Sequence, residues 1–442
     1  IGRRLNKQYR SSFRILLAIR YTFRMATVPR LIEISIDAVP IGTPLQFALR
    51  SNSGHLLASK GYTITSRSEL EKIRTRGLGL AIDMNESDAA LRSYLQRVNS
   101  MILDDASLAN IAMARIESFS SGTIEPMTVP GGFPDFWAYQ TRLHAVLTHP
   151  DPATFQQRIG SIQKELSHFI TKYPDASLTA VVHLSSRELS QYSAMHSLLV
   201  WVIVSMTARF ALHWEDVLVD SLGKAALTMN IAMTQLQDKL SLQRGPLTSE
   251  QRRIVEDHHE MSRTQLMALG VEDTVWLDAV FYHSDKTPGP LHERSPGQQL
   301  GRLIQRADVL GARLSPRAHR PPMPTPAALL ASYFDEMQQP DEAGAAIVRT
   351  LGIYAPGSYV KLANGEVGVV VRRRLGRPGT MGRCPRVLIL INKDDFPLTA
   401  HVERDTALPE FAIVGPVDVA RIRVSVPLEK LLRASDKVLW TP

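Results

Sequence analysis

The chain has 442 residues, of which 44% are hydrophobic and 21% are charged, and it contains a single cysteine, Cys384. This composition is typical of a soluble globular protein with two or three domains. One cysteine excludes disulfide bonds within the chain and thiolate-rich metal sites, so we expect a reducing, cytoplasmic setting.

The formal net charge of +8 is concentrated at the N-terminus, where the first 24 residues hold seven basic residues and the first acid is Glu33. The remaining chain is close to neutral, so we expect no nucleic-acid binding. We expect residues 1–30 to be a disordered or artefactual tail, because Met25 directly precedes the first strand-like sequence and an overextended start would explain Ile1. A basic tail that contacts an anionic membrane or resembles a transit peptide is the alternative.

No segment is predicted to span a membrane. The longest apolar run, Leu198 to Ala208, has about eleven residues before Arg209, whereas a transmembrane helix needs ~20. We predict a buried core helix there.

Residues 31–117 are predicted to form a small α+β module. Alternating apolar residues from Leu31 indicate a strand, and residues 44–49 and 55–58 flank a polar, glycine-ended connection typical of a hairpin. Residues 61–64 indicate a further strand.

Two helices are predicted in the same module. Ser66 and Glu69 have the spacing of a capping box, which predicts a short helix that ends at Gly77. Helical periodicity returns over residues 87–116. Residues 118–134 are rich in proline and glycine, so we predict that they form a linker.

Residues 135–345 are predicted to form a helical domain. Proline, glycine and capping signals separate its helices, and Thr248 with Gln251 forms a second predicted capping box. The predicted helices cover residues 135–148, 155–173, 220–243, 276–283 and 299–314, with further helices that begin at His196 and at Thr248.

Residues 346–442 are predicted to form a C-terminal β extension, either a small barrel-like unit or a sheet, packed on the helices. Residues 358–362 and 367–371 flank Asn364-Gly365, which favours a hairpin with a type I′ turn. Residues 387–391 continue the sheet. The expected fold is therefore mainly α, with a helical core between two smaller β-containing parts.

Ionisable residues recur at long intervals on the central helices: His196, His258, His283 and Asp308. Phosphodiester hydrolysis commonly uses two divalent metals held by histidines and carboxylates, which ionise a water and neutralise the leaving oxygen. A single histidine on a helix is more often an ordinary hydrogen-bonded residue.

The segments around these residues resemble the HD-GYP family of bacterial phosphodiesterases that hydrolyse cyclic di-GMP. The resemblance covers roughly residues 170–375. The matching segments are Ala225 to Met233, Gly245 to Glu250 followed by His258, Phe281 to His283, and Arg306 to Val309.

The resemblance implies an HD-type helical core, and it leaves His196, His258, His283 and Asp308 as residual metal ligands. Other family positions are substituted: Tyr192 replaces a Glu, Met229 and Asn230 replace the His-Asp doublet, Met233 replaces a Lys, and Tyr282 replaces a His. The Gly-Tyr-Pro motif is reduced to residues 287–290.

These substitutions predict the loss of a two-metal centre and of catalytic residues. The neutral amide of Asn230 cannot bridge two cations as a carboxylate does, and the thioether of Met229 is a soft ligand. We expect no cofactor; if any is bound, we expect a divalent metal such as Fe or Mn. The surviving ligands either form hydrogen bonds in the core or hold one weak metal site.

Arg317 and Arg320 lie where the resemblance implies residues that hold substrate phosphates. Two cations three residues apart suit phosphodiester oxygens. The alternative is a solvated basic turn.

The sequence therefore predicts a degenerate HD-GYP protein of cyclic di-GMP signalling, which acts as a nucleotide sensor or protein-interaction module without turnover. One alternative is an active metal-dependent phosphodiesterase with an altered ligand set, and another is a scaffold that binds neither metal nor nucleotide. The implied partners are cyclic di-GMP and signalling proteins such as GGDEF-domain proteins.

Overall fold

A computed structural model describes residues 31–83 and 128–436 with internal gaps, at residues 34–35, 37–38, 40, 42–44, 46–47, 52–54, 59–61, 78, 130–131, 187–190, 374–383, 399–401, 420–421 and 423–427. The predicted tail and the helix predicted over 87–116 lie outside the described residues. The chain divides into two compact units, Ile1–Thr123 and Ile124–Pro442, and the division falls within the predicted linker.

The N-terminal unit has a four-stranded antiparallel sheet in the order β1-β4-β2-β3. Its elements are β1 (Leu31–Glu33), β2 (Leu49–Arg50), β3 (Leu56–Ala58), α2 (Arg67–Gly77) and β4 (Ala81–Asp83). The predicted hairpin is confirmed, since β2 pairs with β3. The strand predicted at 61–64 is reduced to an isolated bridge at Thr63.

Helix α2 is also confirmed, but its cap differs from a full capping box. The Glu69 backbone N–H donates to Ser66 Oγ at 3.2 Å, as expected. The Glu69 carboxylate, however, accepts from the Thr65 N–H at 2.8 Å rather than from Ser66. The Glu69 side chain therefore binds the backbone one residue before the expected N-cap, at Thr65 instead of Ser66.

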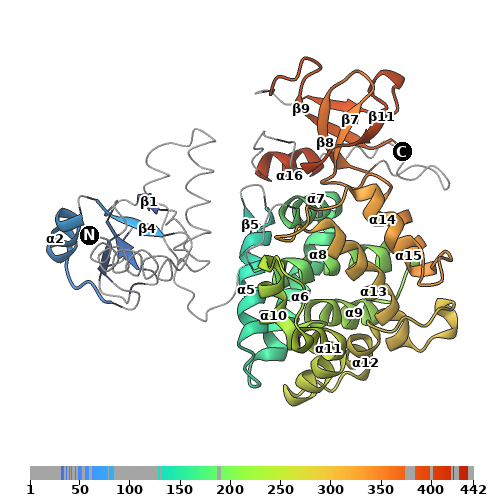
Figure 1. The fold of residues 1–442 in the computed structure, drawn as a ribbon, viewed down its shortest axis with the longest axis horizontal. Helices are drawn as coiled ribbons and strands as arrows, with labels where there is room; N and C mark the ends of the chain where they lie inside the picture. Colours follow the sequence, from blue (N-terminus) through green and yellow to red (C-terminus); the bar gives the residue numbers. More distant parts are fainter. Residues whose placement is uncertain are drawn as a thin grey trace, which may run out of the picture. The chain divides into compact units, whose positions relative to one another are not determined.

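The second unit is mainly helical, and Figure 1 shows α8 within a group of helices, with the β-strands and α16 at one end. The described helices are α5 (Phe136–Thr148), α6 (Phe155–Lys172), α7 (Pro174–Ser185), α8 (Tyr192–Thr207), α9 (Asp216–Thr228), α10 (Thr234–Leu242), α11 (Ser249–Ala268), α12 (Thr274–Tyr282), α13 (Pro296–Leu314), α14 (Thr325–Tyr333), α15 (Glu342–Leu351) and α16 (Leu428–Asp436), with a π-helical turn η2 (Ala208–Leu212) and the 3₁₀ turns η3 (Ile231–Met233), η4 (Leu291–Glu293) and η5 (Pro409–Phe411).

Helix α8 is the centre of this unit. Every residue from Tyr192 to Thr207 is buried, and α8 packs against α5, α7, α9, α10, α13 and α15. Together with η2 it is long and apolar enough to cross a membrane on length and composition alone, but 78% of that stretch is buried inside the fold. Such burial is typical of the core helix predicted here.

Several predicted helix boundaries need correction. Helix α8 begins at Tyr192 rather than at His196, and α9 begins at Asp216 rather than at Asp220. The helix predicted over 220–243 is broken, because Asn230 leaves the helical conformation (φ −109°, ψ 18°) and η3 intervenes before α10. Helix α13 begins three residues earlier than predicted, because Ser295 and Gln298 form a capping box and Pro296 occupies the first turn.

The C-terminal part is a five-stranded antiparallel sheet in the order β10-β9-β8-β7-β11. Its strands are β7 (Tyr359–Leu362), β8 (Val367–Arg372), β9 (Arg386–Ile391), β10 (Glu403–Asp405) and β11 (Ile413–Pro416). Helix α16 packs between α7 and β8, which joins the sheet to the helical core.

The β7–β8 hairpin lies where it was predicted, but its turn is not type I′. Gly365 alone has a positive φ, of 91°, and the Gly365 N–H donates to Leu362 O at 2.9 Å. The loop is therefore a type I turn followed by a glycine bulge, which suits a three-residue connection.

Part of the predicted linker is ordered. Strands β5 (Thr128–Val129) and β6 (Phe133–Pro134) form a small hairpin, and Phe133 is buried in the helical core. The end of the segment 118–134 therefore belongs to the second unit.

Candidate functional site

The four residual ligands lie on four helices and form two contacting pairs. His196 on α8 contacts Asp308 on α13, with Nε2 and Oδ1 2.6 Å apart. His258 on α11 contacts His283 at the end of α12, with their Nε2 atoms 2.9 Å apart. The charge of Asp308 acts to raise the pKa of both His258 and His283, so the two pairs lie within electrostatic range of each other.

The His196–Asp308 pair is buried on the histidine side and open on the carboxylate side, with side-chain exposures of 1% and 37%. Gly311, one turn after Asp308, allows the close approach of the helices, because a Cβ there would lie 3.2 Å from His196 Cε1. Burial acts to raise the pKa of Asp308, but the hydrogen bond and charge of His196 outweigh it and leave the pKa lowered. Asp308 is thus an ionised acceptor committed to His196.

Tyr192 covers the other side of His196. The two rings are stacked, with centroids 5.7 Å apart and an interplanar angle of 9°. The Arg317 guanidinium lies 5.8 Å from the centre of the Tyr192 ring, within cation–π range. A position at which the family has a carboxylate is therefore filled by a buried aromatic ring that packs on one ligand.

The His258–His283 pair has an unusual distribution of protons. The Nδ1 atoms lie 2.6 Å from Val255 O and 2.5 Å from Val280 O, and a carbonyl can only accept, so both Nδ1 atoms carry the proton. If both rings are neutral, neither Nε2 atom carries a proton, and the two nitrogens face each other with their lone pairs.

Burial lowers the pKa of His258, and it lowers the pKa of His283 to about 4 with help from His258. Protonation at neutral pH is therefore disfavoured. The two lone pairs point to a position that a metal cation would satisfy.

The remaining substituted positions supply no anionic ligand. Met229 is fully buried, and Asn230 is buried with its Oδ1 lacking a hydrogen-bond partner among the described residues. The Ala232 N–H donates to Ser262 Oγ, one turn after His258, so the Asn230 segment lies against α11. Met233 and Tyr282 are half-buried.

The residues fit one metal ion at most, and they do not fit a two-metal centre. Within the described ranges, no three or more His, Cys, Asp or Glu side chains converge in an arrangement that could hold a metal. His258 and His283 offer two free Nε2 lone pairs, whereas His196 and Asp308 satisfy each other.

The two arginines face different surroundings. Residues 317–320 form a tight turn, closed by paired backbone hydrogen bonds between Arg317 and Arg320. Arg320 Nη2 donates to Ala312 O at 2.5 Å, at the C-terminus of α13. Arg317 lies over Tyr192, beside the His196–Asp308 pair. Of the two, Arg317 is the one that lies beside the residues of the candidate site.

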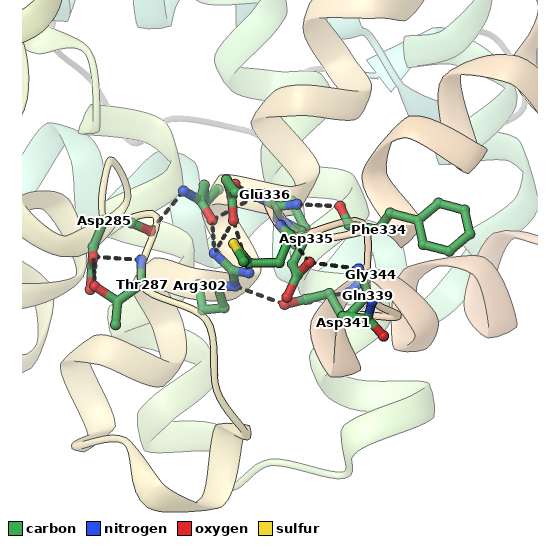
Figure 2. Close-up of polar contacts among 12 residues, drawn as sticks. Asp285, Thr287, Arg302, Phe334, Asp335, Glu336, Gln339, Asp341 and Gly344 are labelled. Atoms are coloured by element: carbon green, nitrogen blue, oxygen red, sulfur yellow. Dashed lines mark hydrogen bonds and ion pairs between the residues drawn. The ribbon is translucent and has the colours of Figure 1, made fainter.

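A buried ion network holds α13 in place (Figure 2), and the sequence did not indicate it. Arg302, only 1% exposed as a side chain, donates from Nε to Asp341 Oδ2 at 2.8 Å and lies 3.3 Å from Glu336. Arg306 pairs with the same glutamate. Since Arg302 and Arg306 lie six and two residues before Asp308 on α13, the network fixes the helix that carries it.

The same network reaches the segment after His283. Gln305 Nε2 donates to Asp285 O at 2.7 Å, and Arg302 Nη1 donates to Gln305 Oε1 at 2.5 Å. The only sequence signal was two arginines four residues apart on an otherwise apolar helix face. Their carboxylate partners follow about 30 to 39 residues later.

No family model matches the chain. The chain is 25% identical over 237 residues to the cyclic di-GMP phosphodiesterase PA4108 of Pseudomonas aeruginosa, which covers 52% of this chain and 54% of that protein. It thus spans about half the length of this curated relative. This match is in keeping with the resemblance of the motif segments to the HD-GYP family.

A solved structure, Bd1817, a HDG"Y"P protein from Bdellovibrio bacteriovorus, is similar over 72% of this chain and 98% of that one, with a TM-score of 0.41 and 12% identity. Compared with the HD-GYP motif that it resembles, the chain differs at Tyr192, Met229, Asn230, Met233 and Tyr282. Its four retained motif residues form the two pairs described above.

Proposed function

We propose that the chain is a degenerate HD-GYP protein of bacterial cyclic di-GMP signalling, which acts without nucleotide turnover. The observation that carries this proposal is the Tyr192–His196–Asp308 arrangement. His196 and Asp308 bind each other at 2.6 Å, and Tyr192 is stacked on His196. A metal ion would have to break the contact between two of its own ligands and displace a packed ring.

The missing bridging carboxylate supports the same proposal. Two-metal hydrolysis needs an anionic ligand between the ions, so that the attacking water is ionised and the leaving oxygen is neutralised. Asn230 presents an amide that has no negative charge, and its Oδ1 is buried without a donor in the described part of the chain. The site therefore lacks the group that would bring two cations together.

Cyclic di-GMP is the ligand we propose, by analogy with the relative that carries this name. Arg317 would supply the charge that holds a phosphodiester oxygen, since it lies beside the residues of the candidate site and its Nε has no partner among the described residues. Signalling proteins such as GGDEF-domain proteins in the cytoplasm are the partners that this function would require.

A second candidate is an active phosphodiesterase with an altered ligand set. The observation that favours it is the pair of free Nε2 lone pairs on His258 and His283. These two residues would hold a divalent metal such as Fe or Mn. Such an ion would supply Lewis acidity at a phosphoryl oxygen.

The decisive experiment is to incubate the full chain with cyclic di-GMP and either Mn or Fe, and to follow linear product by chromatography. We expect no product beyond the amount of protein present. Product over many turnovers that His258→Ala abolishes would establish the enzyme instead.

Calorimetry with cyclic di-GMP then separates a sensor from a scaffold. Saturable binding without turnover supports the sensor. If high micromolar nucleotide gives no binding, the scaffold alternative remains.

A further inference from the structure

A second polar site lies on the other side of α8 from the histidines. It is a groove of about 560 Å³ between α6, η2 and α9, lined by Gln163, Lys164, His168, Arg209, Asp220 and Lys224 among others. Its volume is in the range of small-molecule sites. His196 and Trp201, which mark the two sites on α8, are five residues apart and so about 140° apart around the helix.

The floor of the groove is built from buried, mutually fitted groups. The Gln163 side chain is buried and accepts a hydrogen bond from Trp201 Nε1. Gly223 lies against it so closely that a Cβ would fall 2.1 Å from Gln163 Oε1. Any side chain at position 223 would therefore displace the amide. Gly160, one turn before Lys164 on α6, leaves open space, since a Cβ there would meet nothing within 4 Å.

One wall carries basic groups without an acidic partner. Lys164 and His168 are one turn apart on α6, and both are exposed. Among the described residues, no carboxylate pairs with Lys164, and His168 makes only an edge contact with the Phe169 ring. Two cation-forming groups on one helix face thus point into the same groove.

The end of the groove is formed by Arg209, which a π-helical turn carries. Arg209 Nη1 lies 2.8 Å from Asp216 Oδ1, but the Asp216 side chain is 87% exposed and that of Arg209 only 25%. Arg209 Nε is buried and has no partner in the described part of the chain. An exposed ion pair contributes little, so Arg209 has donors to offer to a ligand. π-Helical turns are often found at functional sites.

The opposite wall adds a neutralised cation. Lys224 Nζ lies 2.5 Å from Asp220 Oδ2, so this pair contributes no net charge. The pair of Arg209 with Asp216 is likewise neutral overall. The excess positive charge of the groove therefore belongs to Lys164, with His168 beside it.

We propose that this groove binds the anionic group of a small molecule, a phosphate or a carboxylate, between Lys164 and Arg209. The Lys164 ammonium and the guanidinium of Arg209, whose ion pair with Asp216 is exposed and weak, supply charge-assisted hydrogen bonds to the oxygens. His168 and the Gln163 amide lie beside the bound group. This site uses none of the residues of the histidine cleft, so it stands whether or not the chain binds cyclic di-GMP.

The test is calorimetric titration of the full chain with inorganic phosphate and, separately, with acetate, at constant ionic strength. Both titrations are repeated in an Arg317→Ala background, which removes an anion contact at the cleft. We expect saturable binding of at least one of the two anions that persists in this background. The anion with the higher affinity, phosphate or acetate, shows whether the groove recognises a phosphate or a carboxylate group.

Lys164→Gln should weaken that binding at least about ten-fold, as the loss of one charge-assisted hydrogen bond predicts. Lys239→Gln, an exposed lysine on α10 outside the groove, should change nothing. Far-UV circular dichroism verifies that both variants are folded, and Arg209→Gln provides a second variant. The proposal is overturned if neither anion binds up to tens of millimolar, or if binding is unaffected by both Lys164→Gln and Arg209→Gln.

Discussion

The Nε2 atoms of His258 and His283 lie 2.9 Å apart, while both Nδ1 atoms face backbone carbonyl oxygens. Three short contacts therefore require three ring protons, and two neutral imidazoles have only two. The pair must gain a proton or another cation, or lose one contact. Because burial lowers the pKa of both rings, a proton is a poor solution at neutral pH.

The missing ring proton between His258 and His283 predicts how much metal the protein binds. After dialysis against Mn or Fe, we expect no more than one weakly held equivalent per chain by elemental analysis. His283→Ala should remove it, because the pair then loses one lone pair. His196→Ala should leave it, because His196 is bound to Asp308.

His259→Ala is the matched control, since this half-buried neighbour of His258 faces Glu256 O. Two equivalents bound at the cleft would contradict the one-metal limit.

The two arginines should respond differently to substitution. Arg317→Ala should weaken cyclic di-GMP binding about ten- to a hundred-fold, since a charge-assisted hydrogen bond contributes about 1.5–3 kcal/mol. Arg320→Ala should mainly reduce the free energy of unfolding, because Arg320 Nη2 caps the C-terminus of α13 at Ala312 O. Calorimetry and urea denaturation of each variant separate the two effects. Equal loss of binding in both variants would show that Arg320 also contacts the ligand.

Loss of Arg302 should be strongly destabilising. Arg302→Met leaves Asp341, which is only 5% exposed, without its cation, and breaking a buried ion pair costs about 3–5 kcal/mol. Urea denaturation measures this difference. Lys286→Ala, in the exposed segment after His283, should stay within about 0.5 kcal/mol of the wild type. A similarly small change for Arg302→Met would mean that the network relaxes around the gap.

The Glu366–Arg404 ion pair predicts a pH dependence of stability in the C-terminal sheet. Arg404 donates to both carboxylate oxygens at 2.8 and 2.9 Å and, through these hydrogen bonds, lowers the pKa of Glu366 from its usual value of 4.5. A depressed acid stabilises the fold above its unfolded pKa, and the contribution is lost as pH falls through the folded pKa.

Glu366→Gln should therefore lower the free energy of unfolding by about 1.5 kcal/mol at neutral pH, and the difference from wild type should vanish in acid. Urea denaturation curves of wild type and variant, at neutral pH and at a pH below the folded pKa of Glu366, measure this difference in the free energy of unfolding. Glu272→Gln, at an exposed position, should show no such pH-dependent difference. A Glu366→Gln effect that is the same at both pH values would show that packing, not charge, is responsible.

Sequence signals within a few residues, such as capping and turn residues, correctly predicted helix starts and the position of a hairpin. The capping box of Thr248 and Gln251 is present, and the β7–β8 hairpin lies around Asn364-Gly365. The turn type was wrong because contacts from outside the hairpin decide it. The Asn364 N–H donates to Glu410 O at 3.1 Å, and the Asn364 side chain accepts from the Glu366 N–H. Neither contact is visible in the dipeptide.

Long-range pairing set the limit of what could be predicted in the site. Family resemblance indicated that His196 and Asp308 belong to one cleft, but not that they bind each other across 112 positions. The helix break at Asn230 could not be predicted either, because no glycine or proline lies at that position. The ion pair of Arg302 could not be predicted from helical spacing, since its partner Asp341 is 39 residues away in the sequence.

The stacking of Tyr192 on His196 has a consequence for restoring the family motif. Reversion by Tyr192→Glu alone would place a second carboxylate near Asp308 without a metal to neutralise the two, and like charges so close oppose each other. Reversion by Asn230→Asp alone would leave a buried charge without a cation. Each single substitution toward the family motif is therefore expected to lower the free energy of unfolding, and only a set of substitutions made together with a bound cation would avoid this cost.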